Sequence, residues 1–102
     1  MTKISIPFNT WSKERLNNRT KTATSRTKKY GKVGNTFIVN KTRYKLDLIV
    51  KLPLWFIAKC LYSTEGCDNS SEFEMIWCEI HPIKKWVRDQ EVWYHHFFEM
   101  EK

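Results

Sequence analysis

The segment 36–52 restricts the possible fold more than any other part of this sequence. It opens with Thr36-Phe37-Ile38-Val39, turns at Asn40-Lys41, and then alternates apolar with polar residues. Because successive residues of a strand point to opposite faces, this pattern predicts a β-hairpin with one buried face. Ile49 is the one break in the alternation, whose apolar positions are Tyr44, Leu46, Leu48, Val50 and Leu52.

Shorter signals predict the elements that precede the hairpin. Residues 4–6 alternate as in a short strand that Pro7 ends. A helix is expected next, from a cap at residue 9 or 10 to an exit at Asn17-Asn18. The β-branched run 22–27 then predicts a strand, and residues 28–35 predict a glycine-containing loop.

Two helices and a strand are expected after the hairpin. A helix over 53–62 begins with a proline and repeats Trp55, Ala58, Lys59 and Tyr62 at helical steps. The next has capping-box spacing at 71–74 and ends before Pro82, with an apolar stripe of Phe73, Ile76, Trp77 and Ile80. Residues 92–99 form a terminal, aromatic-rich strand.

These elements together predict one domain, 1–102, of the mixed α+β class with a mainly antiparallel sheet. A chain of 102 residues can bury one core and has no room for a second domain. The hairpin face and the stripe of the second helix are therefore expected to share that core. Its members would be Phe37, Val39, Tyr44, Leu46, Leu48, Val50, Phe73, Ile76, Trp77 and Ile80.

Composition indicates a packed protein in a reducing compartment. The sequence has no apolar run long enough for a signal peptide or a membrane span, so a cytoplasmic location without membrane association is expected. The three cysteines, Cys60, Cys67 and Cys78, lack the even, close spacing of a disulfide framework. A monomer is expected.

Charge divides the chain into unlike halves. Residues 1–51 hold thirteen Lys and Arg residues and two acids, whereas residues 52–102 hold five basic residues and nine acids. Such a basic half attracts phosphates, and the rings of Trp11 and Tyr30 within it offer stacking surfaces for bases. A solvated, lysine-rich surface is the plainer interpretation of the same composition.

Several kinds of site are not predicted. Cys78 and His81 stand three apart, but the spacing matches no paired zinc framework, so no metal and no cofactor are expected. Gly31 and Gly34 lack the residues of a phosphate-binding loop. His95 and His96 are neighbours on a strand, so one should be buried and the other at the surface.

The cluster Lys21-Thr22-Ala23-Thr24-Ser25-Arg26 could carry chemistry. Alternation would separate Lys21 from Thr24, but a twist or bulge at Lys21 would let them converge. A partly buried lysine beside a threonine hydroxyl has a lowered pKa and can activate that hydroxyl. The alternative is an edge strand with a solvated lysine and hydrogen-bonding threonines.

At these residues the sequence resembles the ASCH domains of the PUA-like superfamily. The similar stretches are Arg19 to Arg26 and Tyr30-Gly31-Lys32-Val33-Gly34-Asn35, and shorter matches continue in order through Glu65-Gly66, Ile76-Trp77 and Val92-Trp93. Arg19 stands where the family usually has glycine, so a tight turn there would need Asn18 in the left-handed conformation. The resemblance implies a β-barrel with packed helices and a cleft for a nucleic acid or nucleoside.

The resemblance leaves two functions open. One is an RNA- or nucleoside-binding module acting in RNA metabolism through a basic cleft, whose residues would be Lys21, Arg26, Lys28, Lys29, Tyr30, Trp11 and Trp93. The other is an amidohydrolase acting on acylated cytidine, with Lys21 as base, Thr24 as nucleophile and Glu65 as proton carrier. Other members of the family are linked to RNA cleavage, and a structural or protein-binding domain with a vestigial pocket is a further alternative.

Overall fold

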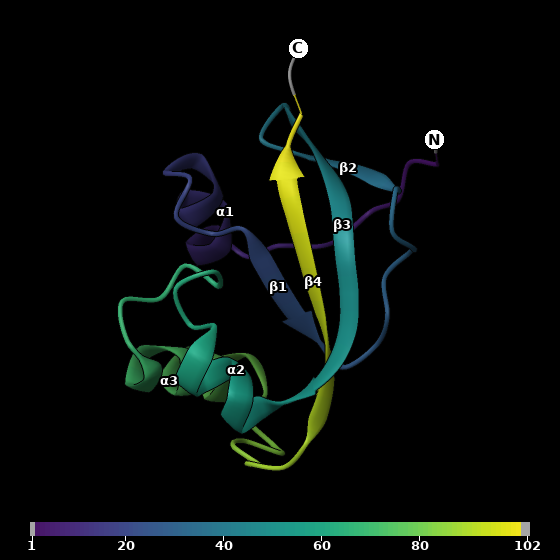
Figure 1. Cartoon of the computed structure of the whole chain (residues 1–102). Helices are drawn as coiled ribbons and strands as arrows, with labels where there is room; N and C mark the ends of the chain where they lie inside the picture. The colour runs from purple at the N-terminus through teal and green to yellow at the C-terminus, as the bar shows by residue number, and fades with distance from the viewer. Residues whose placement is uncertain (1, 101–102) are drawn as a thin grey trace.

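The computed structural model describes residues 2–100 as three helices and a four-stranded sheet (Figure 1). The strands lie in the order β1-β4-β3-β2, and every neighbouring pair is antiparallel. The sheet is curled into a half-barrel, which confirms the predicted α+β class. In chain order the elements are α1 (Thr10–Asn17), β1 (Ala23–Arg26), β2 (Thr36–Val39), β3 (Thr42–Pro53), α2 (Leu54–Cys60), α3 (Ser70–Ile80) and β4 (Glu91–Glu99).

The predicted hairpin is formed by β2 and β3. Asn40 and Lys41 both have positive φ, 52° and 68°, the backbone that suits a two-residue turn between twisted strands. The register with β4 then shifts between Leu46 and Leu48, because β3 carries an extra residue at Asp47. Beyond this bulge the side chains exchange faces. The expectation of a single buried face is therefore wrong, and Leu48 is 48% exposed.

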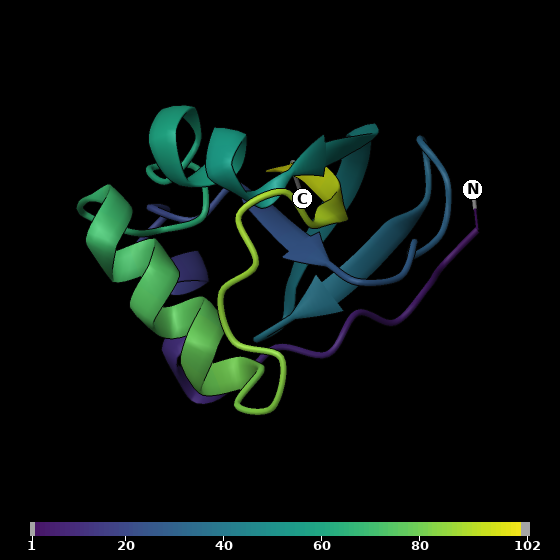
Figure 2. The ribbon, with the colours of Figure 1, turned by 90° about the horizontal axis from the view of Figure 1, so that it is seen from below.

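The apolar residues form two clusters instead of the one core expected. In the first, Phe73 and Trp77 of α3 pack with α2 and with Val92 and Tyr94 of β4. The second joins Leu46, Phe37, Tyr44 and Phe97 with Leu16 of α1. The prediction of a shared core is wrong because β4 turns successive side chains to opposite faces of the sheet, and both faces are packed. Figure 2 shows α2 and α3 beside one end of the curled sheet.

Because the clusters are separate, the losses of stability caused by one substitution in each cluster are expected to add. Leu46→Ala should lower the free energy of unfolding by about 2–5 kcal/mol, and Ile57→Val in the other cluster by about 0.5–1.5 kcal/mol. The double variant should match the sum within about 0.5 kcal/mol, as for sites without shared partners. Urea unfolding of the three variants measures this. A coupling above about 1 kcal/mol would mean that the two clusters act as one core.

The helix ends differ in detail from those expected. The cap of α3 is Asn69, whose Oδ1 accepts a hydrogen bond from the Glu72 backbone N–H at 2.8 Å, so the expected cap at Ser71 is wrong. The Glu72 carboxylate in turn accepts the backbone N–H of Asp68, the residue before the cap, at 2.9 Å. Helix α2 buries Leu54, Ile57 and Ala58 and leaves Trp55 exposed. No helix within residues 2–100 is both long and apolar enough to cross a membrane.

The N-terminal segment forms no strand among the described residues. Its backbone makes a single parallel bridge between Lys3 and Thr36, and the Ile4 N–H donates to the Thr36 carbonyl at 2.8 Å. Ile6 is nevertheless buried, as the alternation required. Pro7 has no N–H to donate, and its carbonyl accepts a hydrogen bond from the Arg26 guanidinium of β1. This course carries Phe8 and Asn9 to the edge of β1.

Candidate functional site

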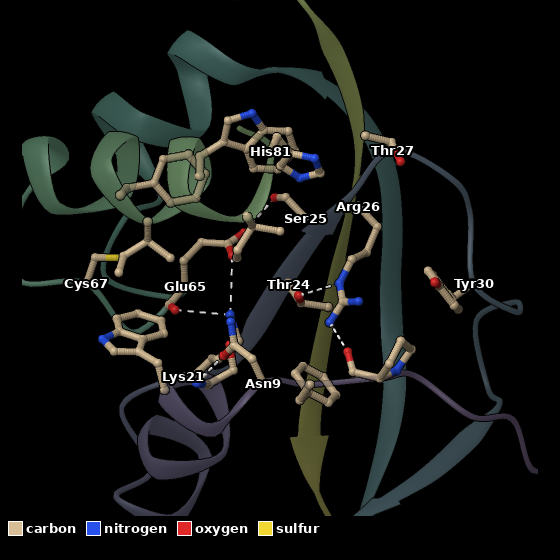
Figure 3. Close-up of a pocket in the computed structure, with 18 of the residues that line it drawn as sticks. Asn9, Lys21, Thr24, Ser25, Arg26, Thr27, Tyr30, Glu65, Cys67 and His81 are labelled. Carbon is tan, nitrogen blue, oxygen red and sulfur yellow. Dashed lines mark hydrogen bonds and ion pairs between the residues drawn. The ribbon is translucent and has the colours of Figure 1, made fainter. Parts of the chain in front are cut away.

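A pocket of about 520 Å³ lies along the free edge of β1 (Figure 3). The start of α1 and the residues before it form one wall, and α3 forms the other. The segment that joins α2 to α3 contributes Glu65 and Cys67. An edge strand has one side unpaired, so side chains from three separate parts of the chain meet there.

A buried ion pair of Lys21 and Glu65 lies in this pocket. Lys21 Nζ is 3.4 Å from Glu65 Oε1 and donates to the Glu65 backbone carbonyl at 3.1 Å. Ser25 donates its hydroxyl to Glu65 Oε2 at 2.6 Å, so both carboxylate oxygens have a partner (Figure 3). The two charged side chains are only 4% and 6% exposed.

The local backbone explains how residues so distant in sequence meet. Thr22 and Ala23 both donate their N–H groups to the Thr64 carbonyl, at 2.7 and 2.9 Å, and Lys21 forms a β-bridge with Glu65. Gly66 follows with a φ of +91°, and a Cβ there would lie 3.0 Å from Arg15 Cβ. Glycine is thus required where α1 crosses this segment.

Burial lowers the pKa of the Lys21 amine, since the charged form loses its hydration. The Glu65 carboxylate opposes this effect, and the Arg26 charge adds to it. The Lys21 ammonium therefore loses its proton at a lower pH than the ammonium of an exposed lysine. Such an amine can accept a proton from a neighbouring group.

Thr24 lines the same pocket, but its hydroxyl is bonded elsewhere. Thr24 Oγ1 accepts a hydrogen bond from Arg26 Nε at 3.0 Å, and Arg26 also donates to the Pro7 carbonyl. Within residues 2–100, the hydrogen bonds of Lys21 Nζ go to Glu65 and not to Thr24. The structure therefore brings Lys21, Thr24 and Glu65 to one pocket, without a direct bond between the lysine and the threonine.

The predicted binding residues divide into two groups. Lys21, Arg26, Lys28, Tyr30 and Trp11 line the pocket, whereas Lys29 and Trp93 do not. The expectation that Trp93 lies near the same pocket as Trp11 and Tyr30 is thus wrong. It fails because Trp93 is on β4, the inner neighbour of the edge strand β1.

His95 fixes the loop that carries Tyr30. Its ring is fully buried, Nε2 accepts the Tyr30 backbone N–H at 2.9 Å, and Nδ1 lies 3.2 Å from the Thr24 carbonyl. This pattern requires the neutral form with its proton on Nδ1, and burial accordingly lowers the pKa of His95. His96 is half-exposed and lies 2.7 Å from Asp47, which confirms the expected division between the two histidines.

Several pocket residues do not stand out in the sequence as part of a site. Ser25 belongs to the Lys21 cluster, but the sequence pattern assigns it no role, and Phe8 has only the spacing of a helix-packing residue. Phe73 and Trp77 are expected as core, and they also form the wall of the pocket. For this wall, the spacing of Trp77 and His81 is the one sequence signal, because residues four apart lie on the same face of a helix. In the structure the centres of their rings lie 4.1 Å apart.

No protein-family model matches the sequence, and no curated protein matches it either. A solved structure does match, the high-resolution crystal structure of an ASCH domain from Lactobacillus crispatus JV V101. The TM-score is 0.67 at 10% sequence identity, and the alignment covers 96% of this chain and 78% of that one. The chain has the fold of an ASCH domain.

Arg19 stands at the position where the resemblance places glycine. Arg19 itself adopts the left-handed conformation, with φ of 61°, while Asn18 remains right-handed with φ of −80°. The turn before Lys21 is therefore made by Arg19 and does not need Asn18 in the left-handed conformation. The Arg19 guanidinium lies 3.5 Å from the Glu99 carboxylate, and the turn leads directly to Lys21.

Proposed function

We propose that this ASCH-fold domain binds RNA by taking one nucleoside unit into the pocket beside β1. The observation that carries the proposal is the pairing of a buried Lys21–Glu65–Ser25 group with aromatic walls in one cavity. A cavity of about 520 Å³ is within the range of small-molecule sites, which are apolar with a few placed polar groups.

The polar and aromatic parts of the pocket suit a base. Sequence-specific RNA recognition uses unstacked bases that stack on aromatic rings and form hydrogen bonds through their edges. Tyr30, Phe8 and Trp77 supply rings. Lys21 supplies a donor and Glu65 an acceptor, so a base edge with an acceptor beside a donor would find both partners.

The mouth of the pocket suits the phosphate. Arg26 and Lys28 line the pocket, and each cation lies over the Tyr30 ring, at 5.6 and 5.0 Å from its centre. Contacts between cations and phosphates position a nucleic acid, whereas contacts to the base give specificity. Lys29 is the next residue of the same loop and is exposed.

The salt dependence of RNA binding tests the role of this loop. For wild type, affinity should fall steeply with salt, because lysines displace counterions condensed on the phosphates. The double change Lys28→Glu and Lys29→Glu should weaken binding and lower the slope by about 0.7 for each phosphate that the loop no longer neutralises. Titration of a labelled single-stranded RNA at several salt concentrations measures both quantities.

A matched control comes from the β2–β3 hairpin, at Lys41 in the turn and Arg43 in β3. Lys41→Glu and Arg43→Glu make the same change in net charge at two exposed positions that do not line the pocket. This variant should keep nearly the wild-type slope. If both double variants behave alike, only the overall charge of the domain matters, and the loop is not the phosphate contact.

A second function, amide hydrolysis of an acylated cytidine, is favoured by the presence of Lys21, Thr24 and Glu65 in one pocket. Neutral Lys21 would take the proton of the Thr24 hydroxyl as Thr24 Oγ1 attacks the acyl carbon. The C–N bond would break, the amine would leave with a proton carried by Glu65, and water would release the acid from the threonine ester. Arg26 would have to release the Thr24 hydroxyl for this attack.

A further inference from the structure

A row of three side chains crosses the sheet next to the pocket. Arg26 of β1 pairs with Trp93 of β4, and Trp93 pairs with Lys51 of β3. Directly paired residues of antiparallel strands point to the same face, with Cβ atoms about 4.5–5.5 Å apart. Arg26 lines the pocket, so the row leads from the mouth of the pocket onto the sheet.

The Trp93 ring carries two cations. Lys29 Nζ lies 5.5 Å and Lys51 Nζ 5.6 Å from its centre, and both lysines are exposed. Among residues 2–100 neither lysine forms an ion pair with a carboxylate. Two like charges beside one half-buried ring repel each other, and a bound anion would relieve this repulsion.

We propose that Trp93 is a second stacking platform, and that Lys29 and Lys51 hold the phosphates of the nucleotide stacked on it. This inference rests on the proposed function and narrows its ligand to single-stranded RNA of two or more nucleotides. One base enters the pocket, the chain passes Arg26, and a neighbouring base stacks on Trp93. Stacking of this kind tolerates any base, because every base has a π-face.

Binding of oligonucleotides and mononucleotides to the full chain tests the platform. The probes are single-stranded hexamers of cytidylate and of adenylate, followed by fluorescence anisotropy, and the matching 5′-monophosphates, followed by calorimetry. Trp93→Ala should weaken hexamer binding about tenfold or more and leave monophosphate binding unchanged. Lys51→Gln should lower the salt slope of hexamer binding by about 0.7.

Trp55→Ala is the matched control, since this exposed tryptophan also carries a cation, Arg88, but lies on α2 outside the pocket. It should bind both probes like wild type. If Trp93→Ala fails to fold, the salt slope of hexamer binding to Lys51→Gln tests the platform instead, since Lys51 is exposed.

Three results would overturn the platform. The first is an unchanged hexamer affinity in Trp93→Ala, and the second is an equal loss of affinity for monophosphates and hexamers in that variant. The third is competition by polyglutamate as strong as by RNA, which would indicate an acidic peptide as the partner. The proposed function fails separately. Hexamer binding that depends on Trp93, without any monophosphate binding, would support the platform and reject the pocket.

Discussion

Glu65→Gln is expected to lower the free energy of unfolding by about 3–5 kcal/mol at neutral pH. The substitution keeps the size of the side chain and leaves hydrogen-bonding atoms for Lys21 and Ser25, but it removes the negative charge. Lys21 is 4% exposed, so its ammonium would then be buried without a counter-charge. Breaking a buried pair in this way costs more than the intact pair contributes, because the remaining charge cannot be hydrated. Urea unfolding of the variant measures the loss.

The loss should depend on pH in a defined direction. Burial lowers the pKa of Lys21, and Glu65 raises it, so the variant lowers that pKa further. The destabilisation is complete at pH values below the pKa of Lys21 in the variant. It disappears as the pH rises through the pKa of Lys21 in the folded wild type, above which the amine is neutral in both folded proteins.

The double variant Lys21→Met and Glu65→Gln is the control, because it removes both charges. Its stability should lie closer to wild type than that of Glu65→Gln, since replacing a buried ion pair by uncharged groups is often neutral. A Glu65→Gln protein as stable as wild type at neutral pH would contradict the buried pair.

The hairpin illustrates how far local pattern predicts this fold. Alternation and the Asn40-Lys41 turn identify β2, β3 and the connection between them, because both depend on neighbouring residues only. The bulge at Asp47 is not predicted, although Ile49 breaks the alternation at that point. In the structure Ile49 packs with the cluster of Leu46, as the shifted register requires. The break in period is therefore the sequence signal of the bulge.

The site depends less on local pattern. No sequence pattern between residues 24 and 65 indicates that Thr24 and Glu65 line the same pocket. Their proximity results from the course of the α2–α3 segment, which is bridged to the chain just before β1 at Lys21 and Glu65. The resemblance to ASCH domains supplies that pairing. It cannot supply the bond from Ser25 to Glu65, which depends on one side chain of this sequence. Nor can the resemblance show that Trp11 lines the pocket and Trp93 does not. Both are aromatic residues near basic ones, and only the order of the strands distinguishes their positions.

Acetate release from N4-acetylcytidine and from acetylated RNA is the expected result if the pocket is an amidohydrolase site. Lys21→Ala, Thr24→Ala and Glu65→Gln should each lower kcat by about 10²–10⁴-fold. Each single change should remove nearly all turnover, because residues that act as one unit are not additive. The rate should rise with pH as Lys21 loses its proton, and the lowered pKa of that amine brings the rise closer to neutral pH than an exposed lysine would allow.

Three neighbouring hydroxyls make the assignment of the nucleophile testable. Thr24→Ser keeps a hydroxyl in the pocket and should retain turnover, whereas Thr22→Ala, at a position that does not line the pocket, should leave it unchanged. Ser25 is the competing nucleophile, because its hydroxyl is already 2.6 Å from Glu65 Oε2. Turnover that survives Thr24→Ala but not Ser25→Ala would transfer the role to Ser25. If wild type releases no acetate from either substrate, the amidohydrolase function is rejected, and the binding proposal is judged by the RNA titrations alone.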